Sequence, residues 1–229
     1  MVADAHVGFS VTDGVAHLEL LRPEKRNAVT AAMWRAIINF ADDGAARDDV
    51  RVLLLRGSGG VFCAGADLAE VKDPDGAPSA EFHALAVTAL QSLARFPKPT
   101  AAVIEGACIG GGVSLAVACD IRFADPGATF AVPAVRHGLV YDQPSIKRLV
   151  DLMGPGGAAQ FLYTAHRIDG RRAAALGLVD ECSDRLDATV TEFAQAVKLG
   201  DLRTVSATKA LLRPLQSVTT STARQSTSD

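Results

Sequence analysis

The sequence lacks long apolar runs and clusters of basic residues. No apolar run among its 229 residues approaches the length of a membrane-spanning helix, and the segment from Met1 to His6 lacks the basic and apolar regions of a signal peptide. Lysine and arginine are interspersed with aspartate and glutamate, and the formal net charge is −3. No basic stripe therefore indicates nucleic acid, and no polybasic segment indicates a membrane surface. We expect a soluble, cytoplasmic protein that binds neither.

The cysteines lack the spacing of a metal site or of a disulfide framework. The chain has four of them, and no two form a C-x-x-C pair. Each stands in an apolar context, so we expect reduced, packed thiols and no bound metal. The four are Cys63, Cys108, Cys119 and Cys182.

Both common phosphate-binding glycine patterns are also missing. The glycines of 106–112 are not followed by Lys-Ser or Lys-Thr, as a Walker loop requires, and they do not fit G-x-G-x-x-G. The glycines of 57–60 fail as well, because Phe62 stands where the third glycine would be. These glycines do not predict a nucleotide site.

Residues 100–120 form a segment in which a predicted strand is followed by glycines and then by a predicted helix. Val103 and Ile104 are β-branched and favour a strand, whereas small apolar residues from Val113 onward favour a buried helix. A helix entered through glycines presents unpaired N–H groups and the positive end of its dipole, which suit an anion or a developing oxyanion. The alternative is that the three glycines of 110–112 only allow tight packing.

The remaining elements predict repeated strand and helix layers in one domain. With 48% hydrophobic residues the chain can bury a large core. Alternation predicts a hairpin at 9–21, and helical spacing predicts helices that begin after Thr30 and Ser79. The other expectations are a strand at 50–55, a surface connection at 73–78, short strands at 121–124 and 128–131, mostly helix over 144–212, and a frayed tail at 217–229.

Four segments of the chain form a recognisable set. They are Leu21-Arg-Pro-Glu-Lys-Arg-Asn-Ala, Gly60-Val-Phe-Cys-Ala-Gly-Ala-Asp-Leu, Lys98 through Gly112 to Ile121, and Ala165-His-Arg-Ile-Asp-Gly-Arg-Arg through Asp180. Together they resemble the crotonase, or enoyl-CoA hydratase/isomerase, superfamily. The second and third segments are the most specific, and the likeness runs from residue 9 to about residue 212.

The resemblance implies an α/β fold, a crotonase-like spiral of repeated ββα units with a helical C-terminal region. We assign 1–195 to the spiral core and 196–229 to a C-terminal helical segment and flexible tail. The implied ligand is an acyl-CoA thioester from fatty acid metabolism, with coenzyme A as part of the substrate and no permanently bound cofactor. The implied assembly is a homotrimer or homohexamer.

The resemblance also assigns site residues. The thioester oxygen would lie between the backbone N–H groups of Ala66 and Gly111, which form an oxyanion hole. These two, together with residues in the first and second segments, would hold coenzyme A. The additional residues are Lys25, Arg26, Ala28, Ala64 and Asp67.

The side chains depart from the hydratase pattern of this family. Its hydratases carry two glutamates, and Ser114 and Ala134 occupy the matching positions here. Hydration needs a base for water and an acid for the α-carbon, so a two-glutamate mechanism is excluded. Asp142 matches the aspartate that dienoyl-CoA isomerases of the family use as an acid/base, which favours isomerase- or lyase-type chemistry. Asp142 can also act as a helix cap next to Pro144, and both roles can hold at once.

Two other functions remain open. An acyl-CoA carrier or sensor could keep the fold and the thioester site without catalysing a reaction. A serine hydrolase is disfavoured, because Ser114, Asp142 and His166 occur in hydrolase order but Ser114 is expected inside a helix instead of on a strained turn. His83 and His137 are more often surface histidines than catalytic ones in such contexts.

Overall fold

The computed structural model describes residues 2–73, 76–77 and 79–215. The predicted tail at 217–229 lies outside these residues, as do residues 74, 75 and 78 of the predicted surface connection.

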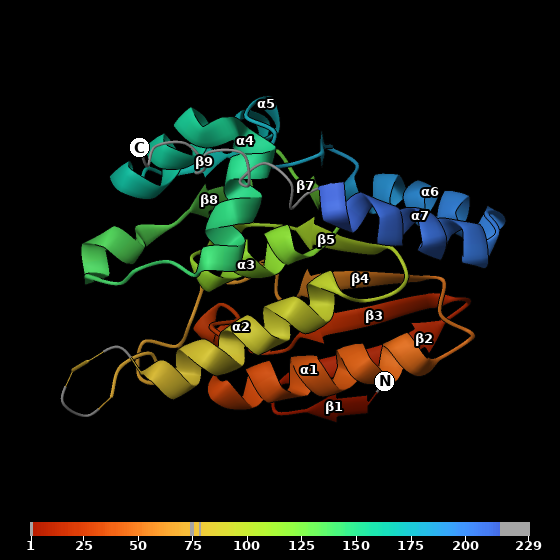
Figure 1. The fold of residues 1–229 in the computed structure, drawn as a ribbon, viewed down its shortest axis with the longest axis horizontal. Helices are drawn as coiled ribbons and strands as arrows, with labels where there is room; N and C mark the ends of the chain where they lie inside the picture. The colour runs from red at the N-terminus through yellow and green to blue at the C-terminus, as the bar shows by residue number, and fades with distance from the viewer. Residues whose placement is uncertain (1, 74–75, 78, 216–229) are drawn as a thin grey trace, which may run out of the picture.

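Over the described ranges the strands form two sheets (Figure 1). The larger sheet has seven strands in the order β1-β2-β3-β4-β5-β7-β10, and the smaller has three in the order β6-β8-β9. The larger sheet contains β1 (Val2–Asp4), β2 (Val7–Thr12), β3 (Val15–Leu20), β4 (Val52–Gly57), β5 (Thr100–Ile104), β7 (Ile121–Ala124) and β10 (Glu181–Cys182). The smaller contains β6 (Ala107–Ile109), β8 (Thr129–Ala131) and β9 (Ile168–Asp169).

The helices follow the strands and fill most of the second half of the described chain. They are α1 (Ala31–Ala46), α2 (Ala80–Ala94), α3 (Gly111–Ala118), α4 (Gln143–Thr164), α5 (Gly170–Ala175), α6 (Leu186–Leu199) and α7 (Leu202–Leu215). Two short 3₁₀ helices, η1 (Pro23–Lys25) and η2 (Pro133–His137), complete the set. Helix α6 runs across the predicted division between residues 195 and 196.

The predicted N-terminal hairpin is confirmed. Strands β2 and β3 pair antiparallel, and the turn residues Asp13 and Gly14 have φ angles of 49° and 78°. Positive φ at both positions is the geometry that matches the twist of a two-residue hairpin, and Asp-Gly adopts it readily. Along β3 the alternating residues Ala16, Leu18 and Leu20 are fully buried, as predicted.

Strand β4 is apolar throughout because both of its faces are covered. It pairs in parallel with β3 and with β5, and parallel strands in the middle of a sheet are usually buried on both sides. Leu53 and Leu55 join the core under α1 and α2, whereas Val52 and Leu54 pack in a second cluster with α6. Figure 1 shows α1 and α2 side by side along the sheet.

The helix starts that the sequence predicts are also confirmed. The side chains of Thr30 and Ser79 accept hydrogen bonds from the backbone N–H groups of Met33 and Phe82, which caps α1 and α2. Asp142 caps α4 in the same manner. At Gly154, followed by Pro155, the backbone leaves helical geometry, so α4 consists of two helical pieces joined at a kink.

Two glycine-bearing segments from different sheets come together. The loop after β4 leaves the larger sheet, and the turn between β6 and α3 leaves the smaller one, each at the carboxyl end of its strand. A parallel bridge between Cys63 and Cys108 joins the loop after β4 to β6, the strand that leads into this turn. The candidate site is built on this junction.

Candidate functional site

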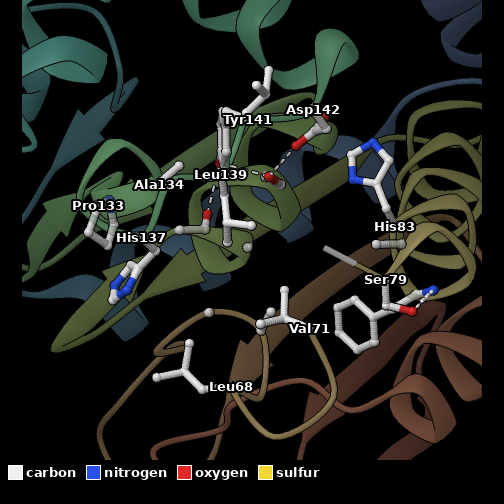
Figure 2. A pocket seen from close by; sticks show the side chains of 18 of the residues that line it. Leu68, Val71, Ser79, His83, Pro133, Ala134, His137, Leu139, Tyr141 and Asp142 are labelled. Atoms are coloured by element: carbon white, nitrogen blue, oxygen red, sulfur yellow. Dashed lines mark hydrogen bonds between the residues drawn. The ribbon is translucent and has the colours of Figure 1, made fainter. Parts of the chain in front are cut away.

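A cavity of about 600 Å³ lies against the two glycine-bearing loops (Figure 2). Its wall is largely apolar, and two of its residues, Leu68 and Val140, are mostly exposed at 66% and 90%. A pocket of this size and character suits a largely apolar small molecule. The wall comes from the loop after β4, from α2, from the start of α3 and from the segment that joins η2 to α4.

The backbone N–H groups of Ala66 and Gly111 lie close together in this wall. A Cβ atom placed on Gly111 would be 3.3 Å from the backbone nitrogen of Ala66, and both residues line the cavity. Their neighbours are engaged elsewhere, because Asp67 N–H donates to Val29 and Gly110 N–H donates to Ala131. Within the described chain no hydrogen bond uses the N–H of Ala66 or of Gly111. The predicted pair of donors is thus brought together at the first turn of α3.

Glycines allow the two loops to approach this closely. Gly65 has φ of 106°, and a Cβ on it would lie 2.9 Å from the carbonyl oxygen of Ile109. A Cβ on Gly112 would lie 2.5 Å from the carbonyl oxygen of Cys63. Neither position can carry a side chain without a shift of the backbone. The three-glycine turn and the loop after β4 can therefore pack this closely only with glycine at positions 65 and 112.

A hydroxyl chain connects the start of α3 to the start of α4. Ser114 Oγ, on α3, lies 2.7 Å from the hydroxyl oxygen of Tyr141 and 2.8 Å from Oδ2 of Asp142. The hydroxyl of Tyr141 also lies 2.8 Å from the carbonyl oxygen of Gly110. Oδ1 of Asp142 accepts a hydrogen bond of 2.8 Å from Ser145 N–H, which caps α4. Figure 2 shows this chain at one end of the cavity.

The hydroxyl chain is buried. Ser114 is 3% exposed and Asp142 is 8% exposed. Burial raises the pKa of the Tyr141 hydroxyl well above its ordinary value, and the neighbouring Asp142 adds to the rise, so Tyr141 is a neutral phenol near pH 7. Asp142 is both a helix cap and a member of the cavity wall, as the sequence allowed.

Asp142 is the one carboxylate among the described residues that line the cavity. Ser114 and Ala134 are in the wall as well, and His83 and His137 face the cavity from α2 and η2. Figure 2 shows His83 on the side of Asp142, and His137 on the side of Ala134. The cavity therefore combines backbone donors, one carboxyl group and two histidines.

Comparison with known proteins identifies the family of the chain. The family model for enoyl-CoA hydratase/isomerase matches residues 10–227. The chain belongs to the enoyl-CoA hydratase/isomerase family. Among curated relatives, the probable enoyl-CoA hydratase echA6 of Mycobacterium leprae is 34% identical over 185 residues, which are 80% of this chain and 73% of that protein.

The same family resemblance extends to a second curated protein and to a solved structure. The mitochondrial Delta(3,5)-Delta(2,4)-dienoyl-CoA isomerase of Mus musculus is 33% identical over 186 residues, covering 76% of this chain and 57% of that protein. A crystal structure of an enoyl-CoA hydratase/isomerase family protein from Hyphomonas neptunium has a TM-score of 0.88 at 33% identity, covering 95% of this chain and 85% of that one. The crotonase-like α/β fold with C-terminal helices is thereby confirmed.

The residues expected to hold coenzyme A divide into two groups. Ala64, Ala66 and Gly111 line the cavity, whereas the others lie outside its wall. Lys25 and Arg26 are exposed at and just after η1, and Arg26 carbonyl accepts a hydrogen bond from Ala64 N–H. These two cations therefore stand beside the loop after β4.

Asp67 and Ala28 belong to the support of the same loop. Nη1 of Arg22 lies 2.5 Å from Asp67 and 3.1 Å from the carbonyl oxygen of Ala28. This hydrogen bond to Arg22, more than any other cause, lowers the pKa of Asp67. A parallel bridge between Val29 and Ala66 then ties the segment to the donor residue itself.

The hydrolase arrangement is incomplete in this family member. Ser114 and Asp142 are in contact, but Ser114 lies inside α3, and exposed His166 is absent from the described cavity wall. Tyr141, the residue that sequence reasoning assigned no role, completes the hydroxyl chain instead. Its one sequence signal is its position next to Asp142.

The thiols are packed, as predicted. All four cysteines are free; Cys63, Cys108 and Cys119 are buried, and Cys182 is half-buried. No cluster of three or more metal-binding side chains is found in the described ranges. In the same ranges no helix has the length and apolar character needed to cross a bilayer.

Proposed function

We propose that the protein binds an acyl-CoA thioester in the apolar cavity and performs acid/base chemistry of isomerase or lyase type on its acyl group. The observation that carries the proposal is the pair of free backbone donors, Ala66 and Gly111, in a cavity with one carboxyl group, Asp142. Membership of the enoyl-CoA hydratase/isomerase family supports the thioester as ligand.

The chemistry follows from where charge develops. When a proton leaves the carbon next to a thioester, negative charge moves onto the carbonyl oxygen. Two N–H groups aimed at that oxygen, at the positive end of α3, stabilise the enolate more than the ground state. Asp142 is placed to move a proton at the acyl chain, since it lines the same cavity.

A two-glutamate hydratase is not proposed. Ser114 and Ala134, the residues that stand at the expected glutamate positions, are both in the cavity wall. Neither side chain can act as the general base that activates water or as the general acid that protonates the α-carbon. We therefore expect crotonyl-CoA hydration to be slow or absent, far below the ordinary enzyme range of about 1–10³ s⁻¹.

A non-catalytic acyl-CoA carrier or sensor is the second candidate. The observation that favours it is that both carboxyl oxygens of Asp142 are already used inside the protein, by Ser114 and by Ser145 N–H. In this function the donors hold the thioester carbonyl and Asp142 only fixes the start of α4. A homotrimer or homohexamer in the cytoplasm is proposed for either function.

Calorimetric titration with coenzyme A, acetyl-CoA and a long-chain acyl-CoA tests the common part of both candidates. We expect the long-chain thioester to bind most tightly, because its chain can fill the apolar cavity. Absence of heat with every CoA ester at millimolar concentration would refute acyl-CoA binding. Incorporation of solvent deuterium into bound saturated, enoyl and dienoyl thioesters then separates the two candidates, since a carrier leaves all of them unlabelled.

A further inference from the structure

We propose that Tyr141 is a positioning residue of the oxyanion hole: its hydroxyl holds the carbonyl of Gly110, which fixes the direction of the Gly111 N–H and strengthens it as a donor. Tyr141 lies in the segment that joins η2 to α4, and it is part of the cavity wall. The use of this donor by a thioester rests on the proposed function, whereas the hold on the peptide is a property of the protein without ligand.

The peptide between Gly110 and Gly111 carries both of the groups concerned. In a trans peptide the C=O of one residue and the N–H of the next point in opposite directions within one plane, and this peptide is trans. A contact that fixes the carbonyl of Gly110 therefore also fixes the N–H of Gly111. Within the described chain no hydrogen bond uses that N–H, so it is available to a ligand.

Sterics alone fix the plane of this peptide poorly. It has glycine on both sides, and Gly110 has φ of 52° and ψ of −116°, a conformation that glycine adopts far more readily than other residues. Without Cβ atoms, rotation of the plane meets little resistance. Because the two groups are opposed, a rotated plane would turn the Gly110 carbonyl toward the cavity in place of the Gly111 N–H. Hydrogen bonds therefore have to set the orientation.

Three hydrogen bonds reach the carbonyl of Gly110. Two come from backbone N–H groups in the first turn of α3, those of Val113 at 2.8 Å and Ser114 at 3.2 Å. The third comes from the hydroxyl of Tyr141 at 2.8 Å, and among the described residues it is the one side-chain contact of this carbonyl. A carbonyl has no proton, so the phenol is the donor. The first two bonds move with α3, whereas Tyr141 anchors the peptide to the segment before α4.

Tyr141 is itself held in place and has the proton that this role needs. Ser114 Oγ lies 2.7 Å from the phenol oxygen, and the chain continues directly into Asp142, the cap of α4. Burial raises the pKa of the Tyr141 hydroxyl well above its ordinary value, so the phenol is protonated near pH 7. Its one proton goes to Gly110, which leaves none for a thioester. Tyr141 thus acts through the Gly111 N–H and not on the substrate itself.

The bond from Tyr141 also changes the strength of the donor. A hydrogen bond to an amide oxygen draws electron density from the nitrogen of the same amide, and linked hydrogen bonds polarise one another. The Gly111 N–H becomes more positive and holds a developing oxyanion more tightly. Figure 2 shows Tyr141 beside Asp142, whose carboxyl group lies 2.8 Å from Ser114 Oγ. One short segment therefore supports both the donor and the carboxyl group of the site.

Nuclear magnetic resonance of the ligand-free, full-length protein can observe this peptide selectively. Glycine labelled with ¹³C at its carbonyl and with ¹⁵N gives carbonyl-to-amide correlations only where glycine follows glycine. In this chain the amides concerned are those of Gly60, Gly111, Gly112 and Gly157. Assignment in the uniformly labelled protein then identifies the signal of the Gly110–Gly111 peptide, and Gly60 and Gly157 are internal references.

Tyr141→Phe keeps the aromatic ring and removes the donor. The Gly110 carbonyl carbon and the Gly111 nitrogen should both move upfield, because a hydrogen bond to the carbonyl deshields both nuclei. The two reference signals should not move. Tyr163→Phe is the matched control at a tyrosine that is 76% exposed, and it should leave all four signals in place.

A stronger donor at the same position should shift the signals in the opposite direction. The chain has two tyrosines, so in the Tyr163→Phe background 3-fluorotyrosine enters only at position 141. Fluorine makes the phenol a better donor, and the Gly110 and Gly111 signals should move downfield. This protein keeps the hydroxyl, so the measurement does not depend on the folding of Tyr141→Phe. Signals that stay in place in both proteins would overturn the proposal.

Octanoyl-CoA with ¹³C at its thioester carbonyl tests the effect on the donor. Binding to the wild type and to Tyr163→Phe should lower the infrared stretching frequency of this carbonyl, because two N–H groups draw on its oxygen. In Tyr141→Phe the lowering should be smaller, and affinity should fall by about twofold to tenfold, the range of a single net hydrogen bond. An equal lowering in wild type and Tyr141→Phe would overturn the role of Tyr141 in the oxyanion hole. A wild type that binds no octanoyl-CoA would refute the proposed function, and the signals of the ligand-free protein would still decide whether Tyr141 holds the peptide.

Discussion

The first residue of α3, Gly111, stands so near Ala66 that an added β-carbon would lie 3.3 Å from the Ala66 nitrogen. The space between these two backbones is where a thioester oxygen would have to fit. Both N–H groups are free in the described chain, and each belongs to a loop fixed by glycines. A substitution at Gly111 can therefore test the donor pair.

Replacement of Gly111 by proline should remove one donor with little damage to the helix. Gly111 is the first helical position of α3, where proline is tolerated because that N–H has no partner in the helix. We expect turnover to fall by about 10²–10³-fold, the usual loss for one oxyanion donor. Turnover of an acyl-CoA substrate and the melting temperature are the two measurements. Unchanged turnover in a folded variant would exclude Gly111 as a donor.

Replacement of Asp142 by asparagine should separate binding from chemistry. Asparagine keeps the cap of α4 and the shape of the side chain, so affinity for an acyl-CoA should stay within about threefold. Loss of the transferable proton should slow deuterium incorporation from D₂O by about 10²–10⁴-fold. If wild type and variant incorporate deuterium equally, another residue performs the proton transfer.

The width of the cavity next to α2 should limit the acyl chain. Ala86 lines the cavity and is half-buried, so Ala86→Phe fills space that a long chain would use. Overpacking of this kind costs about 1–3 kcal/mol, which is about fivefold or more in affinity for a long-chain acyl-CoA. Affinity for coenzyme A should not change. Ala84→Phe, at an exposed position of the same helix, is the control, and an equal loss in both variants would place the acyl chain elsewhere.

The thiols should make folding sensitive to alkaline pH. Burial raises the pKa of Cys63 and of Cys119 to about 12, whereas an unfolded cysteine titrates near 8.5. A group whose pKa is raised on folding stabilises the protein fully below the unfolded pKa and loses that contribution as pH rises towards the folded pKa. The free energy of unfolding should therefore fall from about pH 8.5 upward, and Cys63→Ser should reduce the slope. A flat profile over this range would contradict the assignment.

The ion pair between the buried Arg122 of β7 and Asp180, whose side chain is 41% exposed, should be costly to break. The guanidinium of Arg122 is 1% exposed and is paired with Asp180, which also accepts the Arg122 backbone N–H at 2.8 Å. Asp180→Ala leaves a buried cation with carbonyl partners only, and we expect a loss of about 3 kcal/mol in unfolding free energy. Chemical denaturation measures it, and Asp184→Ala, at an exposed pair with Arg171, should lose less than about 1 kcal/mol.

Local patterns predicted most of the fold. The alternation of Ala16, Leu18 and Leu20 and the turn at Asp13 and Gly14 fixed a hairpin, because both signals depend on neighbours in the chain. The strands that the patterns missed, β1, β6, β9 and β10, have only two or three residues each. Such short strands have no periodicity of their own and exist only through their partners.

The site was predictable where backbone conformation defines it. Glycines at 65 and 110–112 indicate close approach, and the family resemblance located the donors on Ala66 and Gly111. The hydroxyl chain was not predictable, because Ser114 and Tyr141 are 27 residues apart and meet only when α3 packs against α4. Asp142 was foreseen as a cap and as an acid, but its contact with Ser114 follows only from the folded structure.

The bridges that link the loop after β4 to its neighbours determine how this part of the molecule opens. Val29 pairs with Ala66, and Cys63 pairs with Cys108, so the loop after β4 is bridged to the segment of Val29 on one side and to β6 on the other. The Cys63 carbonyl accepts Ile109 N–H at 2.9 Å, and the Gly65 carbonyl accepts Val29 N–H at 2.8 Å. Separation of one loop breaks bonds of the other, so their amide protons should exchange with solvent in a single cooperative event instead of loop by loop.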